Sequence, residues 1–220
     1  MEALAANELS YHETRFSFDQ RREIVWQTLC SCFFSKLVQP DFHVLELGAG
    51  YGHFINNIRC AKKSAIDQWP KMLEYLRPEV AGHIGSVTDL SFLPDNSVDF
   101  VLASNLFEHL TQQEFSVTLA EIRRKLKRNG SLNILQPNYR LAYKEYFDDY
   151  THVSIYSDLS LCDFLSANGF EIIESMPGFL PFSIKSSKGR ARPWLIKMYV
   201  ASPWKPMAKQ MLIRAKLASS

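Results

Sequence analysis

Short apolar runs alternate with stretches of helical periodicity along most of this 220-residue chain. Continuous apolar runs are typical of parallel strands buried on both faces, and residues 42–47, 64–67, 83–85, 98–103 and 131–135 fit this pattern. Apolar residues at helical spacing predict helices over residues 18–38, 53–59, 70–76, 112–127 and 157–167. Strands that alternate with helices predict a doubly wound, three-layer α/β/α sheet with right-handed crossovers.

The remaining segments complete a single-domain organisation over residues 1–220. Residues 1–40 form an N-terminal helical cap, and residues 138–156 form an insertion rich in aromatic and charged residues after the fifth strand. Residues 170–174 predict a sixth strand and residues 210–217 a seventh. The segment 185–220 is basic. We expect the insertion to lie over the carboxyl ends of the strands, where open α/β sheets bind ligands.

The first strand ends in an acid followed by alternating glycines, Glu46-Leu-Gly48-Ala49-Gly50-Tyr-Gly52. Glycine lets the backbone approach a ligand closely, and a helix start beside it suits an anionic or polar ligand. His53 stands where the dinucleotide fingerprint G-x-G-x-x-G needs its last glycine. Asp67 follows Gly48 by 19 residues, the distance at which an acid accepts both ribose hydroxyls. Its alternative role is the N-cap of the helix after Pro70.

Several motifs together resemble the class I S-adenosylmethionine (SAM) methyltransferases. VLELGAGYG (44–52) is similar to the family's first motif, and AIDQWPKML (65–73) to its second strand. GSVTDLSFLPDNSVDFVLASNLFEHL (85–110) and LKRNGSLNILQPN (126–138) follow in the family's order. The resemblance implies a seven-stranded, mostly parallel sheet whose last strand is antiparallel. It implies cofactor contacts from Glu46, Gly48, Ala49, Gly50, Gly52, Asp67, Gln68, Trp69, Ser86, Val87, Ser104 and Asn105.

One position departs from the family pattern. Relatives place Asp where Ser86 stands, so the contact to the adenine amino group comes from Ser86, from Asp89 or from backbone. On the acceptor side, Glu108 and His109 follow the fourth strand, and His152 lies in the D-D-Y-T-H run of the insertion. A neutral imidazole can accept a hydroxyl proton, so these three are the catalytic candidates; their alternative role is structural. Tyr11, His12 and Arg15 are candidates for a lid over the cofactor.

Charge and cysteine content bound the partners. Residues 175–220 hold nine Lys or Arg and no acid, which leaves 16 basic and 23 acidic side chains in residues 1–174. This asymmetry favours either an anionic membrane or lipid-linked substrate at the basic segment, or basic residues that are only solvated. The four cysteines lack paired metal-ligand spacing, so no metal is expected. Without a signal peptide or an apolar run long enough for a membrane span, a cytoplasmic protein is expected, with the inner membrane face as a peripheral site.

The predicted function is transfer of the SAM methyl group to a small molecule, such as a saccharide, a lipid or another biosynthetic intermediate, with S-adenosylhomocysteine as the product. No N-P-P-Y tetrapeptide for flipped bases is present, and no nucleic-acid partner is expected. Two alternatives stay open. One is an NAD-dependent dehydrogenase or epimerase, which shares the strand, turn and ribose acid. The other is a SAM-binding module without turnover.

Overall fold

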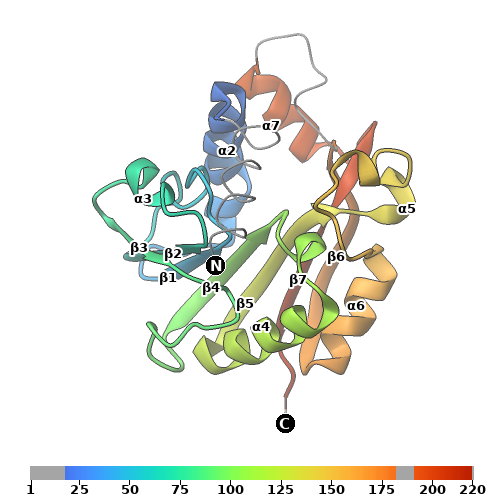
Figure 1. Ribbon diagram of the computed structural model, residues 1–220. Helices are drawn as coiled ribbons and strands as arrows, with labels where there is room; N and C mark the ends of the chain where they lie inside the picture. Colours follow the sequence, from blue (N-terminus) through green and yellow to red (C-terminus); the bar gives the residue numbers. More distant parts are fainter. Residues whose placement is uncertain (1–17, 182–190, 220) are drawn as a thin grey trace.

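A computed structural model of the chain describes residues 18–181 and 191–219. Its centre is a sheet in the order β3-β2-β1-β4-β5-β7-β6, in which β7 runs antiparallel to both of its neighbours (Figure 1). This confirms the predicted seven-stranded, mostly parallel sheet with an antiparallel last strand. The strands are β1 (His43–Leu47), β2 (Lys62–Asp67), β3 (Val80–Ile84), β4 (Val98–Ser104), β5 (Leu126–Pro137), β6 (Phe170–Pro181) and β7 (Ala208–Leu217).

Helices cover both faces of this sheet. One face packs against α4 and α6, and the opposite face packs against α2 and α7 (Figure 1). The helices are α2 (Gln20–Cys32), α3 (Met72–Tyr75), α4 (Gln112–Lys125), α5 (Tyr139–Ala142), α6 (Asp158–Ala167) and α7 (Pro193–Ala201), with 3-10 turns η1 (Phe34–Lys36), η2 (Phe107–His109) and η3 (Tyr146–Asp148).

Local signals explain why α4 forms where it does. Thr111 and Glu114 make a capping box, in which each side chain satisfies a backbone N–H of the first turn. The predicted stripe of Phe115, Leu119 and Ile122 is fully buried against the sheet. Removal of these side chains from water is the main force that holds the helix on the sheet.

The predicted helix over residues 53–59 is wrong, because consecutive turns occupy this segment. The N–H of Ile55, which a regular helix would bond to residue 51, donates to the buried carboxylate of Glu46 at 3.0 Å. Asn57 N–H then bonds the carbonyl of Phe54, three residues back. The glycine-rich start of the segment is therefore held by the first strand and cannot extend as a regular helix.

Other boundaries shift. The helix after Pro70 shrinks to the four residues of α3, β5 begins at Leu126 and β6 runs on to Pro181. The long antiparallel ladder between β6 and β7 explains the extension, since pairing continues as far as Pro181 and Ala208. In the described residues, no helix is long and apolar enough to cross a membrane.

Candidate cofactor and acceptor site

The glycine turn after β1 has a backbone that only glycine adopts easily. Gly48, Gly50 and Gly52 have φ values of +64°, +51° and +66°. The N–H groups of Gly48 and Ala49 donate to the carbonyl of Ile66 at 2.9 and 3.2 Å, which fixes the turn against β2. The turn therefore presents backbone rather than side chains at the carboxyl edge of the sheet, as a closely bound ligand requires.

Alanine at position 48 is expected to lower stability and cofactor affinity together. A Cβ there would lie 2.9 Å from Cδ1 of Leu106, and φ of +64° costs an L-residue roughly 1–2 kcal/mol. Gly85→Ala is the matched control, because its Cβ would have nothing closer than 3.4 Å. Thermal unfolding should show a lower Tm for Gly48→Ala than for both the wild type and the control. Equal Tm values for all three would contradict the strained turn.

Asp67 connects the two loops that face the predicted cofactor. Its Oδ2 accepts from the N–H of Gly50 at 2.7 Å, and its Oδ1 accepts from the N–H of Trp69 at 2.9 Å. Burial raises the pKa of the carboxyl group, and these backbone bonds oppose the rise. Each carboxylate oxygen has a further lone pair, so the same group can also accept from a diol. The N-cap alternative is wrong, because α3 begins after Lys71 without a side-chain cap.

Glu46 lies beneath the glycine turn. It is 4% exposed, and burial raises its pKa to about 8, with the N–H of Ile55 and the nearby charge of Asp67 as smaller influences. Its bond to Ile55 holds the chain that follows the turn. Direct contact of Glu46 with the cofactor remains a prediction.

Aromatic side chains pack beside the turn. Trp69 is 4% exposed; it stacks on Tyr75 with centroids 5.6 Å apart and meets Tyr51 edge-on at 4.9 Å. Phe18 contacts both tyrosines, at 5.6 and 6.1 Å, whereas Gln68 is exposed. Tyr51 and Tyr75 are not among the residues predicted from the sequence, although Tyr51 stands inside the glycine motif that was predicted to contact the cofactor.

The ends of β3 and β4 bring the other predicted cofactor residues to the same edge. Ile84 pairs with Asp67, so Ser86 and the buried Val87 follow just beyond it. The Ser86 hydroxyl lies 2.7 Å from that of Thr88, while Asp89 accepts from the N–H of Ser91 at 2.9 Å.

Beyond Ser104, Asn105 has φ of +50°, and its side-chain oxygen accepts from Gln210 of β7 at 3.0 Å. Leu106 then packs on Gly48. The glycine turn is thus in contact with the loop that follows β4.

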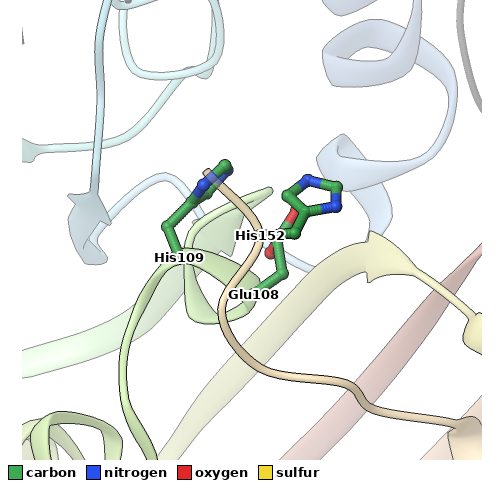
Figure 2. Close-up of side chains that lie close together, drawn as sticks. All are labelled: Glu108, His109 and His152. Carbon is green, nitrogen blue, oxygen red and sulfur yellow. The ribbon is translucent and has the colours of Figure 1, made fainter. Parts of the chain in front are cut away.

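Glu108, His109 and His152 come together although the last two are far apart in sequence (Figure 2). Glu108 is completely buried, and burial raises its pKa to about 8. Burial lowers the pKa of His109 to about 4, with the neighbouring His152 adding to the effect. The two imidazole centroids are 4.9 Å apart. The structure therefore brings together all three side chains proposed for the acceptor side.

Backbone hydrogen bonds set this arrangement. The carbonyl of Glu108 accepts from the N–H groups of Val153 and Ser154 at 2.9 and 3.1 Å, so the insertion is fastened to η2. His109 Nδ1 lies 3.0 Å from the Thr151 hydroxyl and 3.2 Å from the Thr151 carbonyl. His152 Nδ1 lies 2.6 Å from the carbonyl of Tyr146. The lid candidates Tyr11, His12 and Arg15 lie outside the described residues.

Comparison with known proteins identifies similar sequences. A family model described as a methyltransferase domain matches residues 45–134. An uncharacterized protein of Methanocaldococcus jannaschii is 31% identical over 175 residues, which are 79% of this chain and 72% of that protein. An uncharacterized methyltransferase of Bacillus thuringiensis is 30% identical over 53% of this chain, which spans 58% of that relative's length.

Solved structures share the fold. A SAM-dependent methyltransferase from Archaeoglobus fulgidus has a TM-score of 0.68 at 19% identity, covering 96% of this chain and 99% of that one. A Haloferax volcanii protein described as a methyltransferase, solved in complex with the Trm112 methyltransferase activator, has a TM-score of 0.66 at 16% identity. The match covers 100% of this chain and 96% of that one. At these identities the likeness concerns the fold.

Proposed function

We propose that this chain, which belongs to the class I SAM-dependent methyltransferases, methylates a small-molecule acceptor held under the insertion of residues 138–156. SAM is the methyl donor of this family, and a methyltransferase requires an acceptor. The observation that carries the proposal is the contact of Leu106 with Gly48, because it joins the glycine turn to the loop that bears Glu108 and His109. A saccharide, a lipid or another biosynthetic intermediate is the proposed acceptor.

The residues of the turn fit the donor by their chemistry. The positive-φ glycines leave room for close approach, and Asp67 offers carboxylate oxygens to the ribose hydroxyls. Ser86 and Val87 lie at the same edge for the adenine, as expected from the neighbouring register of β2 and β3. Because a sulfonium is already activated, the protein's contribution is alignment of donor and acceptor and exclusion of water.

The insertion supplies the acceptor side. Tyr143, Phe147 and Tyr150 expose 56%, 57% and 61% of their area, an apolar surface that suits stacking on a ring or chain. In the same insertion, the ring of His152 lies 4.7 Å from that of Tyr146 and 4.9 Å from that of His109, measured between centroids. If the methyl acceptor is a hydroxyl compound, a neutral imidazole of His109 or His152 accepts the hydroxyl proton. Glu108 lies close to both imidazoles.

The test combines binding with product detection. Calorimetry should show SAM and S-adenosylhomocysteine binding and no NAD binding, which separates a methyltransferase from a dehydrogenase. Labelled SAM incubated with fractionated host metabolites should then give a methylated product by mass spectrometry. SAM binding without any labelled product would favour a module without turnover. Once the acceptor is found, full turnover by both His109→Ala and His152→Ala would contradict the proton-acceptor role.

We further propose that α7 and the residues after it contact an anionic surface. Trp194, Leu195 and Met198 expose 54%, 46% and 61% of their area, and α7 contains no acid. Trp204 and Met207 follow with 77% and 78% exposed. Tryptophan next to basic residues suits a membrane–water interface, where each Lys or Arg near an anionic surface contributes about 1 kcal/mol to the binding free energy.

Co-sedimentation with vesicles tests this surface. The protein should bind anionic but not neutral vesicles, and high salt should release it, because screening weakens surface electrostatics. Trp204→Ser should weaken binding, while Tyr150→Ser, which removes another exposed aromatic side chain (61% exposed, against 77% for Trp204) from the insertion, should not. If the protein binds neither kind of vesicle, the proposal is wrong and the basic residues are only solvated surface residues. Lys205 has a structural role in either case, since its Nζ donates to the carbonyls of Tyr199, Val200 and Ser202.

A further inference from the structure

Three side chains that can each ligate a metal converge at the acceptor side. One ligand atom from each of Glu108, His109 and His152 lies within 4.8 Å of the other two. Glu108 and His109 come from η2, and His152 from the insertion (Figure 2). Ligand atoms around Zn²⁺, at bond lengths of about 2.0–2.1 Å, lie roughly 3–3.5 Å apart. From separations of at most 4.8 Å, the three atoms therefore need to approach one another by no more than about 1.3–1.8 Å.

The state of Glu108 gives an independent observation. Its side chain is completely buried, and neither carboxylate oxygen has a hydrogen-bond partner among the described residues. Burying a carboxylate without a donor or a counter-charge is costly, and buried charges are normally paired or coordinate metals. No Lys or Arg forms an ion pair with Glu108 in the described part of the chain, so a bound cation would be the partner that stabilises its ionised form.

Both histidines are held as metal-binding histidines usually are. Nδ1 of His152 lies 2.6 Å from the backbone carbonyl of Tyr146, and Nδ1 of His109 lies 3.2 Å from that of Thr151. A carbonyl only accepts, so each Nδ1 carries the proton and the lone pair is on Nε2. A ligating imidazole typically donates its other N–H to such a carbonyl, which fixes the ring and its tautomer.

We propose that Glu108, His109 and His152 bind a divalent transition-metal ion of the zinc type. Two imidazoles and one carboxylate are a known ligand set for catalytic Zn²⁺, and imidazole disfavours Mg²⁺, which prefers oxygen ligands. Three protein ligands leave at least one position for water or an acceptor oxygen. The hydrogen bonds from Val153 and Ser154 to the Glu108 carbonyl hold the two ligand-bearing segments in register.

The chemical role of the ion rests on the proposed function. A cation lowers the pKa of a coordinated hydroxyl, so the acceptor O–H bond breaks with its proton passing to water. The new O–CH₃ bond forms as the S–CH₃ bond breaks, and the electron pair of that bond stays on the sulfur. Under this inference the acceptor is a hydroxyl compound. The two imidazoles either ligate the metal or accept the hydroxyl proton, and a measurement of metal binding distinguishes these two roles.

Metal titration of the tag-free full chain, stripped with a chelator, tests the site directly. Co²⁺ should bind with a stoichiometry of one and give visible absorption bands of a four- or five-coordinate nitrogen–oxygen site. Zn²⁺ should displace it, and excess Mg²⁺ should not. A wild-type protein that binds neither Co²⁺ nor Zn²⁺, or that binds Mg²⁺ equally well, would overturn the proposal without recourse to any variant.

Variants locate the site. Glu108→Gln, His109→Ala and His152→Ala should each weaken Zn²⁺ binding by more than about 100-fold. His83→Ala is the matched control, because His83 is exposed on β3 and stacks on Phe92, away from the cluster. Circular dichroism identifies folded variants, and Glu108→Gln keeps the shape of the side chain. Zn²⁺ affinity that persists in folded Glu108→Gln and both histidine variants would place the metal elsewhere.

SAM calorimetry on the same samples separates this inference from the proposed function. The three ligand variants should keep SAM affinity, because the glycine turn and Asp67 are unchanged. Metal binding without SAM binding would contradict the methyltransferase function and leave the metal site standing. SAM binding without metal binding would leave the function standing and the two histidines as proton acceptors.

Discussion

Replacing Asp67 by alanine is expected to weaken SAM binding by about 10- to 150-fold, which corresponds to roughly 1.5–3 kcal/mol for charge-assisted hydrogen bonds. The substitution removes the proposed ribose acceptor and also the bonds to the N–H groups of Gly50 and Trp69. Asp67→Asn should also weaken binding, because an amide has one acceptor oxygen and its NH₂ group would face one of these two N–H donors. Isothermal titration calorimetry with SAM measures both.

Asp163→Asn is the control for this pair. Asp163 is exposed on α6, on the helix layer that packs away from the glycine turn, so its substitution should leave SAM affinity unchanged. Thermal unfolding shows whether each variant is folded. A folded Asp67→Ala protein with wild-type SAM affinity would refute the assignment of Asp67 to the ribose.

Glu46→Gln is expected to make the protein more stable near pH 8 and to leave its stability near pH 5 almost unchanged. Glu46 titrates near 4.5 in the unfolded chain, whereas burial raises its pKa to about 8 in the folded protein. Between these values the unfolded state loses the proton that the folded state keeps, so deprotonation favours unfolding. Glu46 therefore lowers stability progressively as pH rises from about 4.5 to 8, by an amount on the order of 2 kcal/mol or more.

Glutamine does not titrate, so it removes the pH dependence of stability that Glu46 causes. It retains an oxygen that can accept from the N–H of Ile55. Urea unfolding at several pH values measures the difference between the variant and the wild type, in which groups common to both proteins cancel. The same substitution at Glu74, whose side chain is exposed on α3, is the control. A difference between Glu46→Gln and the wild type that does not change with pH would show that the Glu46 carboxyl is charged in the folded protein.

The proposed site is built from two parts of the chain. The proposed cofactor side depends on neighbouring strands, since Gly48 and Asp67 are held in place by the pairing of β1 and β2. The proposed acceptor side depends on the insertion, whose backbone hydrogen bonds to η2 join residues more than forty positions apart in the sequence. Leu106 packs on Gly48 and so connects the two. If donor and acceptor bind as proposed, substitutions at Leu106 are expected to lower the affinity for both.

Local sequence determined most of the fold. Continuous apolar runs placed β1, β2 and β4 within one or two residues, because a strand buried on both faces needs apolar side chains at every position. The spacing of Phe115, Leu119 and Ile122 gave α4 for a similar reason. Gly48 and Asp67 are 19 residues apart because Gly48 directly follows β1 and Asp67 ends β2, the next strand of the chain. These features depend on neighbours close in sequence.

Tertiary structure decided the rest. Local periodicity favoured a helix after the glycine turn, but the buried Glu46 carboxylate takes the N–H of Ile55 and replaces a helical bond. The position of Tyr51 inside the glycine motif did not indicate that it and Tyr75 would pack against Trp69, because such ring contacts depend on how the loops fold over one another. The approach of His152 to Glu108 and His109 depends on hydrogen bonds between segments more than forty residues apart, and only the folded chain brings such donors and acceptors together.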